Sequence, residues 1–316
     1  MTRRSGEDMS EIILHHYATS PFAEKVRLAL GIKDLAWRSV DIPIMMPKPD
    51  LMPLTGGYRK TPVLQIGADI YCDTQCILRE LERRHPQPSL YRGTDAGAAN
   101  AFAYWSDRNL FQPAVAIVFA MKPTSLPPGF IEDRSKMLGR ELSVEKMRAG
   151  APLMLDQLRA QLQWYETMLS DGRRFMLGEQ PTLADCAAYH PCWFIARALS
   201  TDAAPLNEFP QIRTWLHRVS EIGHGTAKAL SSKEALAIAQ AASPATISAR
   251  DEHDPLGRKP GDQVAVTPDD TGRDPVTGEL VMSSRETIVI RRTDPHIGDV
   301  HVHFPRAGFV VTPAPP

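Results

Sequence analysis

The pattern of apolar and polar positions predicts strands and a helix at the start of the chain. The runs 11–17 and 37–42 are rich in β-branched or alternating residues and are predicted strands. Between them, Phe22, Val26 and Leu30 recur every four residues and therefore share one face of a helix. Gly31 directly follows this pattern and is expected to lie just beyond the end of the helix.

Two further strands and a helix are predicted before residue 86. Residues 46–57 are rich in proline and glycine and are expected to form a loop. Residues 60–66 and 67–73 fit a hairpin that turns near Gly67, and the helix that follows ends before Pro86. The resulting order predicts a mixed four-stranded sheet with helices, an α/β arrangement.

The rest of the chain divides into a linker, a helical part and a β-rich end. We expect a disordered tail at 1–10, a first domain at 11–86, a linker at 87–97, an all-helical domain at 98–243 and a small β appendage at 244–316. In the helical part, the run 99–121 is expected to bend at Pro113, and the run 178–199 is apolar all round and therefore central. The appendage shows four or five short strand patterns that could form a barrel.

Composition restricts the class of protein without identifying it. The chain has 316 residues, 43% of them hydrophobic and 23% charged, with a net charge of −1, values typical of a soluble globular protein. No basic stripe favours nucleic acid, and no apolar run approaches the ~20 residues that cross a bilayer. The four cysteines form no CxxC pair and are expected to be reduced thiols in a cytoplasmic protein. The first residues lack the apolar region of a secretory signal.

Ser20 is the first candidate for chemistry. It stands before Pro21, and Glu24 lies in the first turn of the predicted helix, a pattern that a helix N-cap explains. A helix N-terminus that follows a strand is also an anion site, where a hydroxyl can donate to a thiolate or carboxylate. The sequence leaves both interpretations open.

Two other short motifs also allow a structural or a functional role. Pro62 interrupts a strand-like run, which is explained by an edge position or by a cis bond after Thr61 that turns the backbone of Thr61 toward a ligand. Asp73 and Thr74 precede a helix and suit capping, but a carboxylate and a hydroxyl there also suit the ammonium and carboxylate of an amino acid. The run from Thr182 has the spacing of a capping box and needs only the structural explanation.

Two histidines near the C-terminus are candidate metal ligands. His301 and His303 point to the same side of a predicted strand, and Asp299 shares that side. An exposed polar strand face explains the pattern more simply, so no metal is assigned. Cys72 and Cys76 lie four residues apart around a strand end and are expected to pack in the interior.

The motifs together resemble a known family. SPF at 20–22, KVR at 25–27, TPVL at 61–64, DT at 73–74 and GEQPTLAD at 178–185 occur in the order found in the cytosolic glutathione transferases, over residues 11–240. The first motif is most similar to the serine-type classes, particularly tau. The resemblance implies a thioredoxin-like N-terminal domain and an all-helical domain, with the β appendage outside the family pattern.

The resemblance also implies roles for individual residues. Ser20 would stabilise the thiolate of glutathione, although Tyr17 could compete for it. The peptide would be held by a group of five residues: Lys60, Thr61, Pro62, Asp73 and Thr74. A weaker apolar site for an electrophile would use four aromatic residues: Tyr17, Phe22, Tyr104 and Trp105.

The implied activity is conjugation of glutathione to a small apolar electrophile, a detoxification reaction, by a cytoplasmic homodimer that binds neither nucleic acid nor membrane. One alternative is a binding or interaction protein that kept the fold and lost catalysis. Another is a glutathione-dependent isomerase or dehalogenase. Thiol–disulfide chemistry is disfavoured, because the omega and glutaredoxin types have a cysteine where Ser20 stands.

Overall fold

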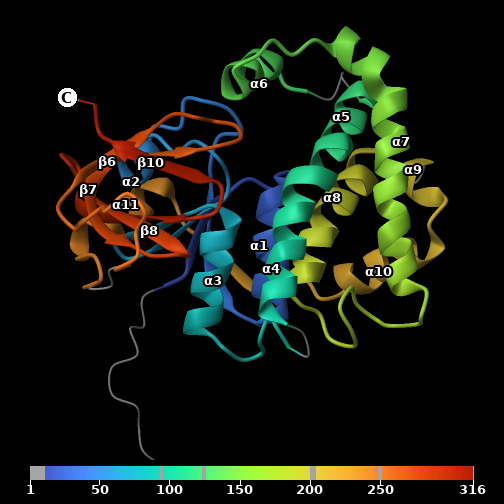
Figure 1. Cartoon of the computed structure of the whole chain (residues 1–316), viewed down its shortest axis with the longest axis horizontal. Coiled ribbons are helices and arrows are strands. Elements are labelled where there is room, and N and C mark those ends of the chain that lie inside the picture. The colour runs from blue at the N-terminus through green and yellow to red at the C-terminus, as the bar shows by residue number, and fades with distance from the viewer. Residues whose placement is uncertain (1–10, 93–94, 123–125, 200–203, 248–250, 316) are drawn as a thin grey trace, which may run out of the picture. The chain divides into compact units, whose positions relative to one another are not determined.

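The chain folds into two compact units, each built from separate stretches of sequence. The computed structural model describes residues 11–92, 95–122, 126–199, 204–247 and 251–315 (Figure 1), and the expected tail at 1–10 lies outside them. The first unit contains residues 1–17, 36–77 and 227–316, and the second contains 18–35 and 78–226. The C-terminal segment therefore shares a unit with the N-terminal strands. Each unit combines stretches from more than one of the predicted domains.

The N-terminal strands of the first unit form as the sequence predicts. β1 runs parallel to β2 and antiparallel to β3, and β3 pairs with β4 across a turn at Gly67. The φ of Gly67 is +59°, a conformation that glycine adopts without steric cost. The strands are β1 (Ile13–His16), β2 (Ala36–Asp41), β3 (Val63–Ile66) and β4 (Asp69–Cys72). The stretch predicted to be a loop contains one short helix, α2 (Met52–Thr55), so that prediction is wrong for these four residues.

The C-terminal strands continue this sheet. β9 pairs in parallel with β4, and the described strands make one ten-stranded sheet in the order β10-β6-β7-β8-β9-β4-β3-β1-β2-β5. The expected β-rich end is present with five strands, as an extension of the N-terminal sheet. The extension pairs the backbone groups that β4 would otherwise expose at an edge. The strands of the extension are β6 (Gln263–Pro268), β7 (Val276–Ser283), β8 (Thr287–Asp294), β9 (Gly298–Pro305) and β10 (Phe309–Pro313). A further strand, β5 (Thr226–Ala229), lies beside β2 at the opposite edge of the sheet.

One hydrophobic core joins the N-terminal and C-terminal strands of the first unit. Ile13 and Ile70 belong to the same buried cluster as Ile290 and Val302. The helix α11 (Ser232–Ala241) packs Ala235 and Ala239 into this cluster, and a Ser231 capping box begins the helix. In Figure 1, α2 and α11 lie against the C-terminal strands. Since the buried area is shared, neither set of strands has a separate core.

The second unit is helical. Among the residues that the structure describes, no helix in either unit is long and apolar enough to cross a membrane. α5 packs against α7 and α8, and α1 packs against α8. Its helices are α1 (Pro21–Ile32), α4 (Ala96–Trp105), η1 (Ser106–Leu110), α5 (Phe111–Met121), α6 (Phe130–Leu138), α7 (Val144–Leu169), α8 (Leu183–Leu199), α9 (Ala204–Asn207) and α10 (Pro210–Ser220), and α3 (Thr74–Arg84) begins in the first unit and ends in the second.

The expected bend at Pro113 takes the form of a π-helical segment. Residues Ser106–Leu110 have π geometry between α4 and α5. Pro113 lacks an N–H and its ring crowds the carbonyl of Asn109, four residues earlier, which lies inside this segment. The wider turn accommodates the missing hydrogen bond. Asp107 lies in this segment and contacts Lys25 and His190.

The prediction for Gly31 is wrong. Gly31 lies within α1, which continues to Ile32. A Cβ at Gly31 would stand 2.1 Å from the carbonyl oxygen of Gly223. The glycine is therefore required by close approach of two backbones, a reason that the helix pattern does not reveal.

Asp185 does more than the capping-box spacing predicts. Its Oδ2 accepts the backbone N–H of Thr182 at 2.9 Å and the Thr182 hydroxyl at 3.1 Å. Its Oδ1 accepts the N–H of Met176 and the indole N–H of Trp215, both at 2.9 Å. The carboxylate thus accepts hydrogen bonds at the start of α8 and links α8 to α10. Burial raises the pKa of Asp185 despite these four hydrogen bonds.

Candidate functional site

Ser20 is the N-cap of α1. Its backbone is extended (φ −74°, ψ 120°), its Oγ accepts the N–H of Ala23 at 3.2 Å, and Pro21 takes the first helical position. Ser20 is only 2% exposed. The bond from Ala23 uses a lone pair of the oxygen, so the hydroxyl hydrogen is left for donation. The capping interpretation is observed, and the thiolate role stays a prediction.

The first turn of α1 is fixed by a buried carboxylate. Glu24 is 3% exposed, accepts from the Arg27 guanidinium at 2.5 and 3.0 Å and contacts His224 Nε2 at 2.9 Å. Burial alone would raise the pKa of Glu24, but the His224 and Arg27 interactions outweigh it and lower the pKa. Arg27 also donates to the carbonyl of Ala18, which fixes the approach to Ser20.

A second buried charged group lies on the neighbouring helices and was missed by the sequence analysis. Asp107, in the π segment, contacts Lys25 Nζ at 2.6 Å and His190 Nε2 at 2.9 Å. Lys25 is 1% and His190 0% exposed. Burial alone would raise the pKa of Asp107, but the Lys25 charge and the His190 bond lower it. The only sequence signal for this arrangement was Pro113, which interrupts the helix near Asp107.

The aromatic residues expected around an electrophile separate into two groups. Phe22 packs against Phe111 and His190, each with ring centroids 4.7 Å away. Trp105 packs instead against Trp164 of α7, at 5.5 Å. Tyr104 lies beneath the Arg108 guanidinium, 4.7 Å from the ring centroid. The structure therefore brings Phe22 to α5 and α8, and Trp105 to α7.

In the first unit, Thr61 and Pro62 precede β3, and the bond between them is cis. Of the two explanations for Pro62, the edge position is wrong, because β3 lies inside the sheet between β4 and β1. Thr61 Oγ1 accepts from Lys48 Nζ at 2.9 Å, and Lys48 also donates to the carbonyl of Arg59. Lys48 is 3% exposed, so the segment before β3 is held by a buried ammonium that the sequence did not single out.

Asp73 has the geometry of a strained cap. Its φ is +74°, which is uncommon for a residue with a Cβ. Its Oδ1 accepts the N–H of Gln75 at 2.9 Å, at the start of α3. Thr74, the first helical residue, is 4% exposed, and Tyr17, at the end of β1, is half-buried.

The C-terminal segment reaches both of these motifs within the first unit. Lys60 forms an ion pair with Asp270, in the loop between β6 and β7. Gln75 Nε2 donates to the carbonyl of Ala307 at 3.4 Å, in the turn between β9 and β10. Two loops of the sheet extension therefore contact residues that flank Thr61 and Thr74.

The cysteines are not placed for thiolate chemistry. None of the four forms a disulfide, as expected, and all four are buried. Burial, with the nearby Cys76 and Asp73 as smaller causes, raises the pKa of Cys72 well above its usual range. A thiol that stays protonated is a poor nucleophile, which supports a packing role.

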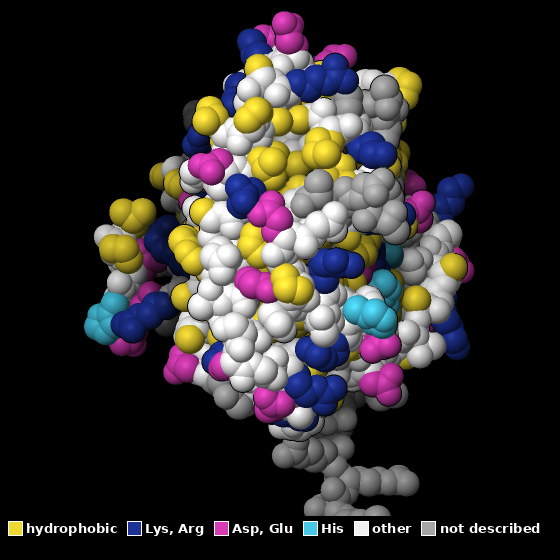
Figure 2. All heavy atoms as spheres, turned by 90° about the vertical axis from the view of Figure 1, so that its right-hand side faces the viewer, with side chains coloured by type: hydrophobic (Ala, Val, Ile, Leu, Met, Phe, Trp, Pro, Cys, Tyr) yellow, Lys and Arg dark blue, Asp and Glu magenta, His cyan; other side chains and the backbone are white. Residues whose placement is uncertain are grey.

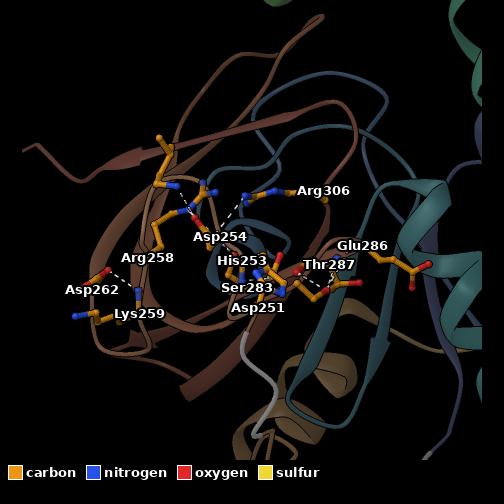
Figure 3. Close-up of polar contacts among 12 residues, drawn as sticks. Asp251, His253, Asp254, Arg258, Lys259, Asp262, Ser283, Glu286, Thr287 and Arg306 are labelled. Carbon is orange, nitrogen blue, oxygen red and sulfur yellow. Dashed lines mark hydrogen bonds and ion pairs between the residues drawn. The ribbon is translucent and has the colours of Figure 1, made fainter.

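Polar contacts of Asp254 hold the loop before β6 in place, as Figure 3 shows. Its carboxylate accepts from Arg258 Nε at 3.0 Å and from the Ser283 hydroxyl of β7 at 2.9 Å, with Arg306 Nη2 at 3.5 Å. The Asp254 side chain is 3% exposed. Burial alone would raise its pKa, but the hydrogen bonds and the Arg258 charge lower it. These contacts give Asp254 a structural role, which is to hold the loop against β7.

The interpretation of His301 and His303 as an exposed polar face is wrong. They are 8% and 6% exposed, and the carboxylate beside them belongs to Asp69 on β4. Asp299 bonds to Thr293 instead. The sequence could not show this because Asp69 is more than 230 residues away along the chain.

A shallow hollow on the second unit holds none of the residues predicted from the sequence. Figure 2 shows one face of the molecule, with basic and acidic side chains interspersed over it. The hollow is lined by residues of α10 and its surroundings: Arg174, Pro210, Arg213, Thr214, His217, Arg218 and Glu221.

Two stretches of the chain match known protein families. Residues 14–89 match the glutathione S-transferase (GST) N-terminal domain. Residues 114–228 match a domain of unknown function, DUF7962. The first stretch contains Ser20, Thr61 and Asp73, and the second covers much of the helical unit.

Solved and curated relatives extend the comparison. A GST-like protein from Pseudomonas syringae is 43% identical, covers 97% of this chain and 100% of its own, and has a TM-score of 0.77. Coverage this complete includes the C-terminal strands. A glutathione S-transferase from Rhodospirillum rubrum F11 is 24% identical over 66% of this chain and 87% of its own, with a TM-score of 0.51, which shows the fold alone. FtsZ-localized protein A of Caulobacter vibrioides (strain NA1000 / CB15N) is 24% identical over 220 residues, 65% of this chain and 85% of that protein.

Proposed function

Because the chain belongs to the glutathione S-transferase-like family, we propose that its first unit binds glutathione through the backbone of Thr61 and the pair Asp73–Thr74. The observation that carries the proposal is the left-handed backbone of Asp73 at the start of α3. Such a conformation costs on the order of 1–3 kcal/mol and persists where the surrounding structure holds it, most often at functional sites.

The chemistry of this segment suits the γ-glutamyl end of the peptide. The Asp73 carboxylate would accept from the ammonium. The N-terminus of α3 and the Thr74 hydroxyl would donate to the α-carboxylate. The resemblance adds that the backbone of Thr61 would bind the cysteinyl part and that Lys60 would lie near the glycyl carboxylate.

The catalytic part of the proposal assigns the thiolate to Ser20. A free thiol has a pKa of about 8.5, so lowering it by about 2 units needs ~2.7 kcal/mol. A charge-assisted hydrogen bond supplies about 1.5–3 kcal/mol and a helix N-terminus about 0.3–1 kcal/mol, which together suffice. The thiol proton would leave to solvent, and the thiolate would form a carbon–sulfur bond to the electrophile as its leaving group departs with the electron pair.

The second substrate is proposed to be small and apolar. Phe22 and Phe111 offer partly exposed aromatic rings on the second unit, and placement of the electrophile would supply much of the rate. Tyr17, Tyr104 and Trp105 remain weaker candidates. The serine-type, tau-like chemistry and the homodimer are parts of the same proposal.

Calorimetric titration of glutathione into the wild type and Ser20→Ala, at pH 6.5 and 8, tests both parts. Repeating it in buffers of different ionisation enthalpy counts the protons released. Ser143→Ala is a matched control, because Ser143 caps α7 in the same way, through the N–H of Lys146. We expect the wild type and the control to bind and release a proton near neutral pH, and Ser20→Ala to bind without release.

The outcomes separate binding from catalysis. If the wild type shows no binding at millimolar glutathione, the whole proposal fails. Should Ser20→Ala bind and release a proton like the wild type, then glutathione binding stands, and the role of Ser20 is reduced to capping.

A second candidate is an interaction protein that does not conjugate glutathione. The observation that favours it is the ion pair between Lys60 and Asp270, which occupies the residue assigned to the glycyl carboxylate. A relative at 24% identity is named FtsZ-localized protein A, so localisation with a partner protein is the kind of role that this candidate would have. Glutathione binding without turnover of any electrophile would favour this candidate, and trials with isomerase or dehalogenase substrates would separate other glutathione-dependent reactions.

A further inference from the structure

Three buried side chains converge on one face of the sheet where the C-terminal extension joins the N-terminal strands. Asp69 is the first residue of β4, and His301 lies directly opposite it on β9. His303 is two residues further along β9 and therefore shares that face. One ligand atom from each residue lies within 4.8 Å of the other two.

The hydrogen bonds of this cluster are incomplete. His303 Nε2 lies 2.7 Å from Asp69 Oδ1, and His301 Nδ1 lies 3.8 Å from the same oxygen, too far for a hydrogen bond. Among the residues that the structure describes, His301 Nδ1 has no hydrogen-bond partner although it is buried. A buried polar atom without a partner destabilises the fold, so a cation that binds this lone pair would remove a penalty.

Neighbouring groups hold these side chains in place, as hydrogen-bond partners do around the ligands of bound metal ions. The backbone N–H of Ala245 donates to Asp69 Oδ2 at 2.8 Å, which leaves Oδ1 toward the histidines. Tyr71 stacks on the ring of His303 with centroids 4.2 Å apart.

The local charge also suits a cation. Arg291 is opposite His301 on β8, but its guanidinium is paired with Glu279 of β7 at 2.6 Å. The pair is neutral as a unit, so the Asp69 carboxylate leaves a net negative charge beside the two imidazoles.

We propose that Asp69, His301 and His303 bind a divalent transition-metal cation of the Zn²⁺ type. Two imidazole nitrogens and one carboxylate oxygen are a common ligand set for such ions and leave a fourth position for water or an external ligand. Metal–ligand bonds of about 2.0–2.2 Å in a tetrahedral arrangement separate the ligand atoms by about 3.3 Å. The observed separations of 2.7 and 3.8 Å from Asp69 Oδ1 lie on either side of that value, and all three ligand atoms lie within 4.8 Å of one another, so binding requires side-chain rotations that adjust these distances.

The consequence is a link between the two ends of the sequence. The cation would join β4 to β9, the pair that connects the N-terminal sheet with its C-terminal extension among the described strands. Metal binding would then stabilise the attachment of the extension, independently of whether glutathione binds.

The test uses the full-length chain, stripped of metal with a chelator and titrated with Zn²⁺ by calorimetry and with Co²⁺ by visible absorption. We expect one equivalent per chain, a tetrahedral Co²⁺ spectrum and slower amide exchange in β9 once Zn²⁺ is bound. His301→Phe keeps the ring volume and removes a ligand, and we expect it to weaken Zn²⁺ binding by at least about 100-fold. His296→Gln, an exposed histidine in the turn before β9, is the matched control and should bind as the wild type does.

Asp69→Asn is the second variant, since it keeps an acceptor for Ala245 and removes the charge; we expect it to weaken binding as well. If His301→Phe fails to fold, Asp69→Asn and the wild-type Co²⁺ spectrum decide. No stoichiometric binding by the wild type, or equal binding by the wild type and a folded His301→Phe or Asp69→Asn variant, overturns the proposal and leaves a metal-free hydrogen-bonded cluster.

Discussion

The ammonium of Lys60 is paired with the carboxylate of Asp270, 210 residues further along the chain. The Lys60 side chain is 16% exposed and that of Asp270 40%. Lys60 precedes the cis Thr61–Pro62 bond, and Asp270 belongs to the sheet extension. The extension therefore supplies a carboxylate at a position where the family resemblance expects the carboxylate of glutathione.

Asp270→Asn should strengthen glutathione binding. Removing the competing carboxylate frees the Lys60 charge, and an exposed ion pair of this kind is worth about 0.2–1 kcal/mol, or roughly 1.4- to 5-fold in affinity. The effect should shrink at high salt, because exposed charges are screened. Calorimetric dissociation constants at low and high salt measure it.

Asp274→Asn is the control for this comparison, since it removes the same charge from an exposed position in the same loop. Equal affinities for the wild type and Asp270→Asn would mean that Lys60 does not contact the peptide.

Asp73→Asn should separate stability from ligand binding. Asparagine tolerates the left-handed backbone and keeps an acceptor for the N–H of Gln75, so the free energy of unfolding in urea should change by less than about 0.5 kcal/mol. Glutathione affinity should fall at least about tenfold, because a hydrogen bond to a charged group contributes about 1.5–3 kcal/mol. Asp34→Asn, at another left-handed position (φ +47°), should change neither quantity. Loss of stability in Asp73→Asn without loss of affinity would assign Asp73 to the fold alone.

The β1 residue His15 should make the protein less stable below neutral pH. His15 Nε2 contacts Gln65 Oε1 at 2.8 Å, and Gln65 donates to the carbonyl of Ala235 in α11, so the ring is held in the interior. Burial, only partly offset by the Gln65 bond, lowers the pKa of His15 to about 4. Between pH 6.5, the usual pKa of histidine, and pH 4, the unfolded chain therefore binds a proton at His15 more readily than the folded chain does. Stability from this group is complete above pH 6.5 and is lost as the pH falls through that window, by about 2 kcal/mol at pH 5.

Urea unfolding of the wild type and His15→Gln at pH 7.5, 6 and 5 measures the linkage. The variant should be less stable at pH 7.5, but it should lose about 2 kcal/mol less than the wild type between pH 7.5 and 5. His253→Gln, on an exposed loop, should follow the wild-type profile. Parallel profiles for the wild type and His15→Gln would show that His15 does not govern this loss.

Local patterns predicted most of the elements because their causes are local. The hairpin around Gly67, the cap at Ser20 and the helix beginning at Thr74 each depend on residues within a few positions, and all three formed as predicted. β5 was missed, since residues 226–229 lie inside the range predicted to be all-helical and their partner β2 lies far away in the chain.

The long-range relationships could not be predicted from one sequence. The partner of His303 is Asp69, that of Lys60 is Asp270, and that of Lys25 is Asp107. Each depends on the sheet or helix packing as a whole, and a single sequence does not record which distant segments meet. The His301 and His303 pattern showed that two side chains share a face, but burial of that face followed only from the pairing of β9 with β4.

Alanine substitutions at two helical glycines should have opposite effects on stability. Gly31→Ala puts a Cβ 2.1 Å from the Gly223 carbonyl oxygen and 2.7 Å from its carbon, both backbone atoms that cannot rotate away. The backbone shift should cost about 1–3 kcal/mol, more than the ~1 kcal/mol that alanine gains over glycine in a helix. Gly150 lies in α7 with no neighbour within 4 Å of an added Cβ, so Gly150→Ala should stabilise by up to about 1 kcal/mol. Urea unfolding of both variants measures the contrast, and a stabilised Gly31→Ala would show that α1 and the Gly223 turn do not approach as closely as described.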